Sequence, residues 1–100
     1  MIRVLTAVLC LATAAPAFAA SAKEKDCGFQ GDVVAAVQAA RVAKVKERDM
    51  VDHIAGTTPD WPEKYNAVVP LVTPWIFSLK MSEVKTADLS AAWNELCLQQ

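Results

Sequence analysis

The residues of this sequence that could do chemistry are few, and the first candidates surround its single histidine. His53 follows Asp49 by four positions, so a helix would place an imidazole and a carboxylate on one face, and both groups bind metals. Asp52 projects about 100° away and adds little. The alternative is a surface histidine near a helix C-terminus, where the helix dipole favours its cation. Because no second histidine can complete a site, the sequence predicts neither a metal nor another cofactor.

Nucleophilic and redox catalysis have no supporting motif. The serines lie outside any Gly-x-Ser-x-Gly sequence, and one histidine would have to serve any catalytic triad. Cys27 and Cys97 form neither a Cys-x-x-Cys pair nor a haem-attachment sequence. Gly28 and Gly31 lack the spacing and the preceding strand of a phosphate-binding loop. We therefore predict that the protein is not an enzyme.

The first nineteen residues have the features of a secretory signal peptide. One basic residue precedes an uncharged, mostly apolar segment, 4–15, which is too short to span a bilayer. Pro16 then precedes Ala17-Phe18-Ala19, whose small residues suit signal peptidase, and we expect cleavage before Ala20. The alternative, a membrane anchor, is disfavoured by the short apolar segment. The expected location is the periplasm or the exterior, without a stable membrane anchor after cleavage.

Removal of the signal peptide changes both the charge and the cysteine count. The whole chain has 10 Lys and Arg against 11 Asp and Glu. Loss of Arg3 leaves a charge of about −2, the wrong sign for binding nucleic acid. Cys10 leaves with the signal, so Cys27 and Cys97 allow one intramolecular disulfide, which an oxidising compartment favours. Two free thiols or an intermolecular bond are the alternatives.

The remaining chain of about 80 residues is predicted to be a flexible tether, 20–26, followed by one helical domain, 27–100. A long helix over Asp32–Ala55 organises this domain, with Asp32 as its N-cap and Gly56 just beyond its end. Its residues spaced alternately by three and four form a packing seam. The seam comprises Val33, Ala36, Ala40, Ala43, Glu47, Met50 and Ile54. The small alanines predict close approach of another helix, within the monomer or across a dimer.

Proline and capping residues divide the rest of the chain. A short helix is predicted over 62–69 and is interrupted by Pro70, and a third helix runs from Pro74 to Met81. A polar turn, 82–86, precedes a terminal helix over Ala87–Leu98 with a clear apolar stripe. No segment shows strand alternation. The predicted fold is all-α: a long N-terminal helix packed by two short helices and a C-terminal helix, joined by the disulfide.

Apolar residues surround almost the whole third helix, and a helix so short is rarely enclosed on all sides. We therefore predict an interaction surface formed by Trp75, Ile76, Phe77 and Leu79. The alternative is that these side chains belong to the core. A second alternative is a pocket for a small apolar ligand, lined by Trp75, Phe77 and Trp93.

Three stretches resemble a family of small uncharacterised exported proteins of alphaproteobacteria: Asp26–Asp32, Trp61–Tyr65 and Ala92–Cys97. That resemblance implies no particular activity and assigns no functional residue. In size, export and a single disulfide, the chain is also similar to the small acid-stress chaperones of the periplasm, at the level of class only.

The function predicted from these features is that of an exported, non-enzymatic protein that binds another protein, or itself, through apolar helix faces. The alternatives are a carrier of a small apolar ligand, and a stress-related or metal-responsive role centred on His53.

Overall fold

The computed structural model describes the backbone of residues 15–100 and the side chains from Ser21 onward. Most of the predicted signal peptide lies outside these described residues. The elements are α1 (Ala15–Val42), the 3₁₀ helix η1 (Glu47–Asp49), α2 (Met50–Gly56), the 3₁₀ helix η2 (Glu63–Val68), α3 (Val69–Ser78), α4 (Met81–Thr86) and α5 (Leu89–Leu98). The described range contains no strand. The predicted all-α fold with a long N-terminal helix is confirmed.

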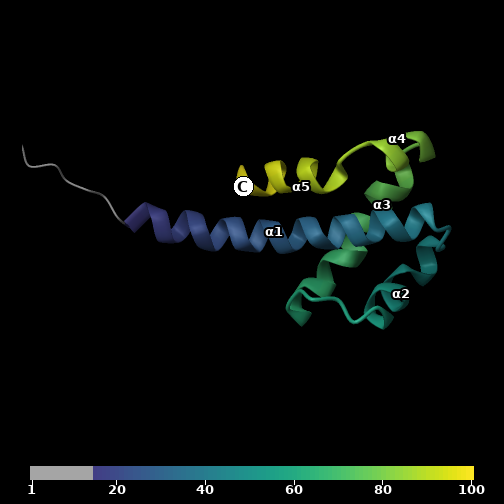
Figure 1. Ribbon diagram of the computed structural model, residues 1–100, viewed down its shortest axis with the longest axis horizontal. Helices are drawn as coiled ribbons and strands as arrows, with labels where there is room; N and C mark the ends of the chain where they lie inside the picture. The colour runs from purple at the N-terminus through teal and green to yellow at the C-terminus, as the bar shows by residue number, and fades with distance from the viewer. Residues whose placement is uncertain (1–14) are drawn as a thin grey trace, which may run out of the picture.

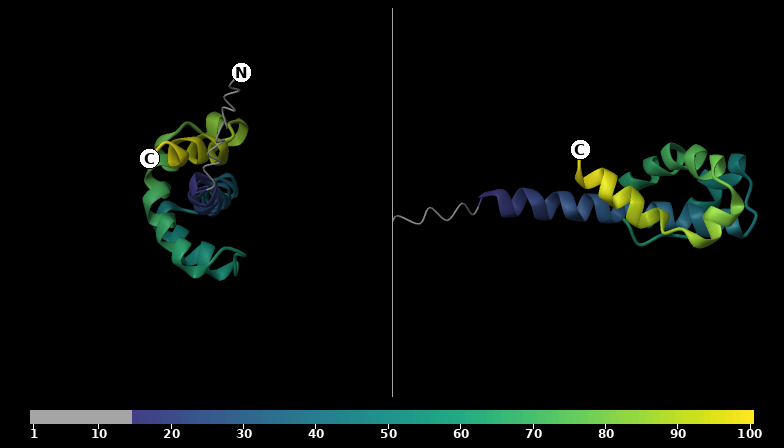
Figure 2. Two further views of the ribbon diagram at one scale, coloured as in Figure 1. Left: turned by 90° about the vertical axis from the view of Figure 1, so that its left-hand side faces the viewer. Right: turned by 90° about the horizontal axis from the view of Figure 1, so that it is seen from above.

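Helix α1 is the axis on which the other elements pack. Figure 1 shows α5 running along one side of α1 and α2 lying on the opposite side, while α3 crosses α1 and leads from the α2 side to the α5 side. Viewed along α1, the later segments curve around one side of it (Figure 2). None of the described helices is both long and apolar enough to cross a membrane.

The predicted continuation of the long helix to Ala55 is wrong, because α1 ends at Val42. Lys44 adopts a positive φ of 70°. The amide of Val45 then donates to the carbonyl of Ala40 at 3.0 Å, which closes the helix end as a C-terminal cap does. The chain reverses there, and η1 and α2 return alongside α1.

This reversal divides the predicted seam between two helices. Its residues Val33, Ala40, Met50 and Ile54 are buried. Ala36 is half-buried, while Ala43 and Glu47 are exposed because they lie in or after the turn. Two fully buried residues outside the seam, Val34 and Val37, widen the apolar stripe of α1. A wider stripe is required because α1 is packed by helices on two sides.

The segment 20–26 is helical, not the predicted flexible tether. Alanine, lysine and glutamate in this segment all favour a helix. The segment is also fastened to the chain end, because the ammonium of Lys23 donates to the carbonyl oxygen of Gln100. As a consequence Asp32 is an exposed residue in the middle of α1 and not its N-cap.

The second half of the chain also begins its helices at other residues than predicted. Pro70 lies in the first turn of α3, where its missing N–H costs no hydrogen bond, so it starts this helix instead of interrupting one. Pro74 lies inside the same helix. The predicted polar turn is helix α4, and α5 is capped by Asp88, whose carboxylate accepts from the amide of Ala91 at 2.9 Å.

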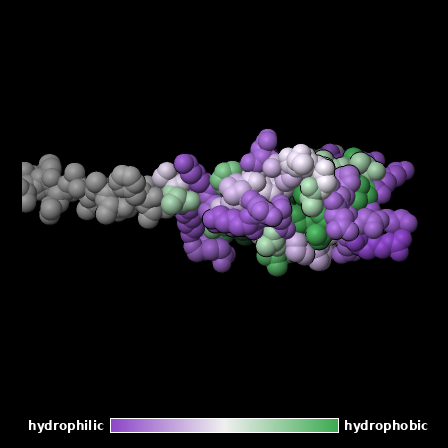
Figure 3. All heavy atoms as spheres, turned by 90° about the horizontal axis from the view of Figure 1, so that it is seen from below, coloured by the Kyte–Doolittle hydropathy of each residue, from purple (hydrophilic) through white to green (hydrophobic). Residues whose placement is uncertain are grey.

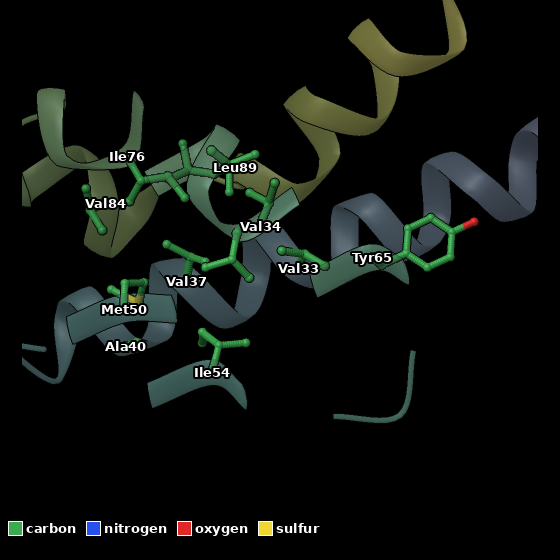
Figure 4. Packing of buried hydrophobic residues seen from close by; sticks show 12 residues of the cluster. Val33, Val34, Val37, Ala40, Met50, Ile54, Tyr65, Ile76, Val84 and Leu89 are labelled. Carbon is green, nitrogen blue, oxygen red and sulfur yellow. The ribbon is translucent and has the colours of Figure 1, made fainter. Parts of the chain in front are cut away.

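The core lies between α1 and the segments that curve around it (Figure 4). Its buried residues are Val33, Val34, Val37, Ala40, Met50, Ile54, Tyr65, Val69, Val72, Ile76, Val84 and Leu89. Most are β-branched or small, which suits close packing around a single central helix.

Two glycines of α1 provide a test of how closely α5 approaches. A Cβ at Gly31 would lie 2.9 Å from the hydroxyl oxygen of Ser90, whereas one at Gly28 would meet nothing within 4 Å. We expect Gly28→Ala to stabilise the protein by about 0.5–1 kcal/mol through helix propensity. Gly31→Ala is expected to destabilise it by about 1–2 kcal/mol, because the clash outweighs that gain. Urea unfolding of both variants measures the difference, and equal stabilisation would contradict the close contact.

Candidate binding groove between the first and last helices

The predicted interaction surface on α3 does not form an open patch. Ile76 is fully buried, and Trp75, Phe77 and Leu79 are half-buried against the core. The ring of Trp75 lies 5.8 Å from that of Trp93. These side chains are therefore largely used in holding the fold together.

Among the side chains that the structure describes, the most exposed large apolar ones are two leucines outside this predicted surface. Leu71 on α3 is 69% exposed, and Leu96 on α5 is 54% exposed. Leu71 was not predicted to be a surface residue, and its exposure contrasts with the full burial of the next residue, Val72. The face of the molecule seen in Figure 3 is mostly hydrophilic, with apolar areas in separate spots.

Helices α1 and α5 run antiparallel and are joined at several points. The hydroxyl of Ser90 donates to the carbonyl of Gly31 at 2.8 Å. About two turns further along α5, Cys97 is bonded to Cys27, with their Cα atoms 5.6 Å apart. The predicted disulfide is confirmed, and it fixes the register between the two helices.

A groove lies between these helices beside the disulfide, with a cavity volume of about 420 Å³. We call it the α1–α5 groove. It is lined from α1 by Lys23, Asp26, Cys27 and Gln30, from α5 by Trp93, Leu96 and Cys97, and by Gln100 just beyond the end of α5. Both sets have the spacing three, one, three, so each forms one stripe along its helix. The α5 stripe is largely apolar and the α1 stripe is largely polar.

Hydrogen bonds hold the polar wall in place. The indole N–H of Trp93 donates to Oε1 of Gln30 at 3.0 Å, and Nε2 of Gln30 donates to Asp26 at 3.0 Å. The hydroxyl of Tyr65 donates to the other carboxylate oxygen of Asp26 at 2.7 Å. This hydrogen bond, together with burial and the negative charge of Asp26, raises the pKa of Tyr65. The wall is therefore fixed from α5 on one side and from η2 on the other.

Two features contain metal-binding residue types, and neither offers three free ligands among the residues that the structure describes. The ligand atoms of Asp26, Cys27 and Cys97 lie within 4.8 Å of one another. Their sulfurs, however, are joined to each other, and metals bind the thiolate. His53 is exposed on α2, and within the described residues it joins no cluster of three metal-binding side chains.

The predicted ligand pocket of Trp75, Phe77 and Trp93 is not formed as such. Trp75 packs on Trp93, and Phe77 lies beneath the guanidinium of Arg41 at 4.9 Å from its ring centre. Of the three, only Trp93 lines the α1–α5 groove.

Five groove residues were not predicted as site residues: Lys23, Asp26, Gln30, Leu96 and Gln100. One signal in the sequence could have found them. The cysteine pair sets which residues of the two helices face each other. Counting three or four residues along each helix from Cys27 and from Cys97 selects the same two stripes. The predicted tether hid this signal, because it removed Lys23 and Asp26 from the helix.

The fold and the groove define a small all-helical protein whose first and last helices are joined by a disulfide. Comparison with known proteins found no matching family model, no matching curated protein and no matching solved structure.

Proposed function

We propose that this is an exported, non-enzymatic binding protein of the periplasm, and that the α1–α5 groove binds a short apolar segment of a partner protein. The observation that carries the proposal is the groove itself, with an exposed apolar wall on α5 facing a polar wall on α1. The signal-peptide features of the first nineteen residues support export, and a disulfide is compatible with it.

The size of the groove favours a short segment over a whole helix. Its volume lies within the range of about 300–1,000 Å³ that is usual for small binding sites. On α1 it extends from Lys23 to Gln30, which is about 10 Å along the helix axis. That length accommodates one or two side chains of a partner.

The chemistry of the walls favours a peptide over a hydrocarbon. Gln30 uses one N–H of its amide for Asp26, and the second, which has no acceptor among the described residues, can donate to a partner's carbonyl. Lys23 has further N–H groups beyond the one that contacts Gln100. A purely apolar ligand would remove water from these groups without replacing its hydrogen bonds, which is unfavourable. A peptide satisfies them while its apolar side chain packs on Trp93 and Leu96.

A carrier of a small apolar ligand is the second candidate. The exposure of Leu96 and the cavity volume favour it, because a compact ligand fits against the α5 wall alone. In that case the polar wall stays hydrated when the groove is filled.

Photo-crosslinking from inside the groove tests the proposal. A benzophenone amino acid in place of Leu96 is expected to form a discrete covalent adduct with a partner in intact cells that have a periplasm. The same amino acid in place of Leu71 is expected to form none. Leu71 is the matched control, because it is a more exposed leucine on another face. An adduct of twice the chain mass would identify a second copy as the occupant.

Identification of the crosslinked peptide then allows a direct binding measurement. Titration of the synthetic peptide is expected to shift the indole N–H resonance of Trp93 and not that of Trp61, which donates to Asn66 away from the groove. Equal adducts from both positions, or no shift at Trp93, would contradict the proposal.

A further inference from the structure

We propose that the α1–α5 groove exists only while the Cys27–Cys97 bond is intact, so that reduction by a dithiol dismantles the site by releasing the end of α5. This inference rests on the proposed function for its biological meaning, but its structural part stands alone. It concerns how α5 is held, and not what the groove binds.

The end of α5 has almost no hydrophobic anchorage. Its only buried residue is Leu89, at the start of the helix. Further along, Trp93 and Cys97 are half-buried, and Leu96 and Leu98 are exposed. Burial of apolar area is the main force that holds one element on another, and here it acts on the first two turns, through Leu89 and through Trp93, which packs on Trp75.

Polar contacts contribute little to holding the last two turns. The described hydrogen bonds from this part of α5 to α1 are the one between Trp93 and Gln30 and the one between Lys23 and the Gln100 carbonyl. The latter is exposed and competes with water. The disulfide is therefore the principal tie, and without it these turns have the features of a locally unfolding segment.

The two sulfurs differ in access, which defines the course of reduction. Cys27 is 1% exposed, whereas Cys97 is half-buried and lines the groove. A thiolate of the dithiol attacks the sulfur of Cys97, forming a mixed disulfide, and Cys27 leaves as a thiolate that takes a proton from water. The second thiolate of the dithiol then attacks the first sulfur of the dithiol, which is bonded to Cys97 in the mixed disulfide. Cys97 leaves and is protonated, and the dithiol has given two electrons and become a disulfide.

The position of Cys97 also couples binding in the groove to reduction of the disulfide, and this coupling acts in both directions. A segment bound in the groove covers the sulfur that is attacked, and it binds only the oxidised form. By thermodynamic linkage, whatever favours the closed groove disfavours reduction. Redox state and occupancy of this site therefore control each other.

Hydrogen exchange measured by mass spectrometry on the full mature protein tests the inference. Reduction with dithiothreitol is expected to remove the protection of the amides in 93–100, while those in α3 exchange faster only because global stability is lower and remain protected. The Cys27→Ala/Cys97→Ala variant, without reductant, is expected to reproduce the pattern. Intact mass confirms the redox state of each sample.

Two results would overturn the inference. Unchanged exchange in 93–100 would show that other contacts hold α5. Complete loss of protection in α3 as well would show that the whole domain unfolds and that no local switch exists. Neither result depends on a partner, so failure of the proposed function, seen in the crosslinking experiment, is recognised separately.

Discussion

Ile76→Ala is expected to reduce the free energy of unfolding by about 3–4 kcal/mol, whereas Leu71→Ala in the same helix changes it by about 0.5 kcal/mol or less. Ile76 is fully buried among core residues, so its truncation leaves a cavity that the surrounding helices fill only in part. Leu71 is 69% exposed and loses little contact. Urea unfolding followed by circular dichroism measures both changes.

The pair decides which face of α3 is turned to the core. Both substitutions shorten an aliphatic side chain to alanine in the same helix, so the main difference is burial. A large loss at Leu71 together with a small loss at Ile76 would show that α3 is rotated relative to α1. It would also return Ile76 to the surface where the sequence pattern had placed it.

Removal of the disulfide by Cys27→Ala/Cys97→Ala is expected to lower the free energy of unfolding by about 4 kcal/mol. The two cysteines are 70 positions apart, and releasing so long a loop gives the unfolded chain much more conformational freedom. In a domain of this size, that loss lowers Tm by about 15–30 °C. Alanine is chosen because Cys27 is buried and serine would bury a hydroxyl.

The dependence of the unfolding free energy on urea concentration, which is the slope of the urea transition, identifies the origin of this loss of stability. A chain without the bond exposes more surface when it unfolds, so its slope is expected to rise while the midpoint falls. A variant with an unchanged midpoint would show that the bond does not constrain the unfolded chain. An unchanged slope with a lower midpoint would place the effect in the folded state.

Local patterns were enough to predict the helical class and the disulfide. Residues spaced by three and four, without strand alternation, indicate helices regardless of how these pack. The bond followed from counting: with Cys10 in the predicted signal peptide, only Cys27 and Cys97 remained. Neither inference required knowledge of which helices touch.

The errors lie where tertiary contacts decide the local structure. Lys44 ends α1 in a conformation that usually belongs to glycine, and no proline or glycine marks the turn. The reversal is favoured by the burial that it permits, since Met50 and Ile54 enter the core when α2 folds back. Residues 20–26 are helical partly because α5 reaches them, which depends on the register set by the disulfide.

The same register explains why the sequence did not indicate the α1–α5 groove and why the predicted surface residues Trp75 and Phe77 are half-buried. Trp75 and Phe77 have the composition of an interaction surface, but Trp93 and Arg41 from other helices cover them. The groove combines two ordinary stripes that become a site only when α1 and α5 lie antiparallel.

The disulfide also determines how the molecule transmits mechanical load. Cys27 and Cys97 are 70 positions apart along the chain, yet their Cα atoms are separated by 5.6 Å. Tension applied to the residues flanking the two cysteines passes directly through the covalent bond and bypasses the loop between them. The helical core within that loop is therefore shielded from stretching. Force applied to the N-terminal side reaches the groove through the part of α1 that precedes Cys27.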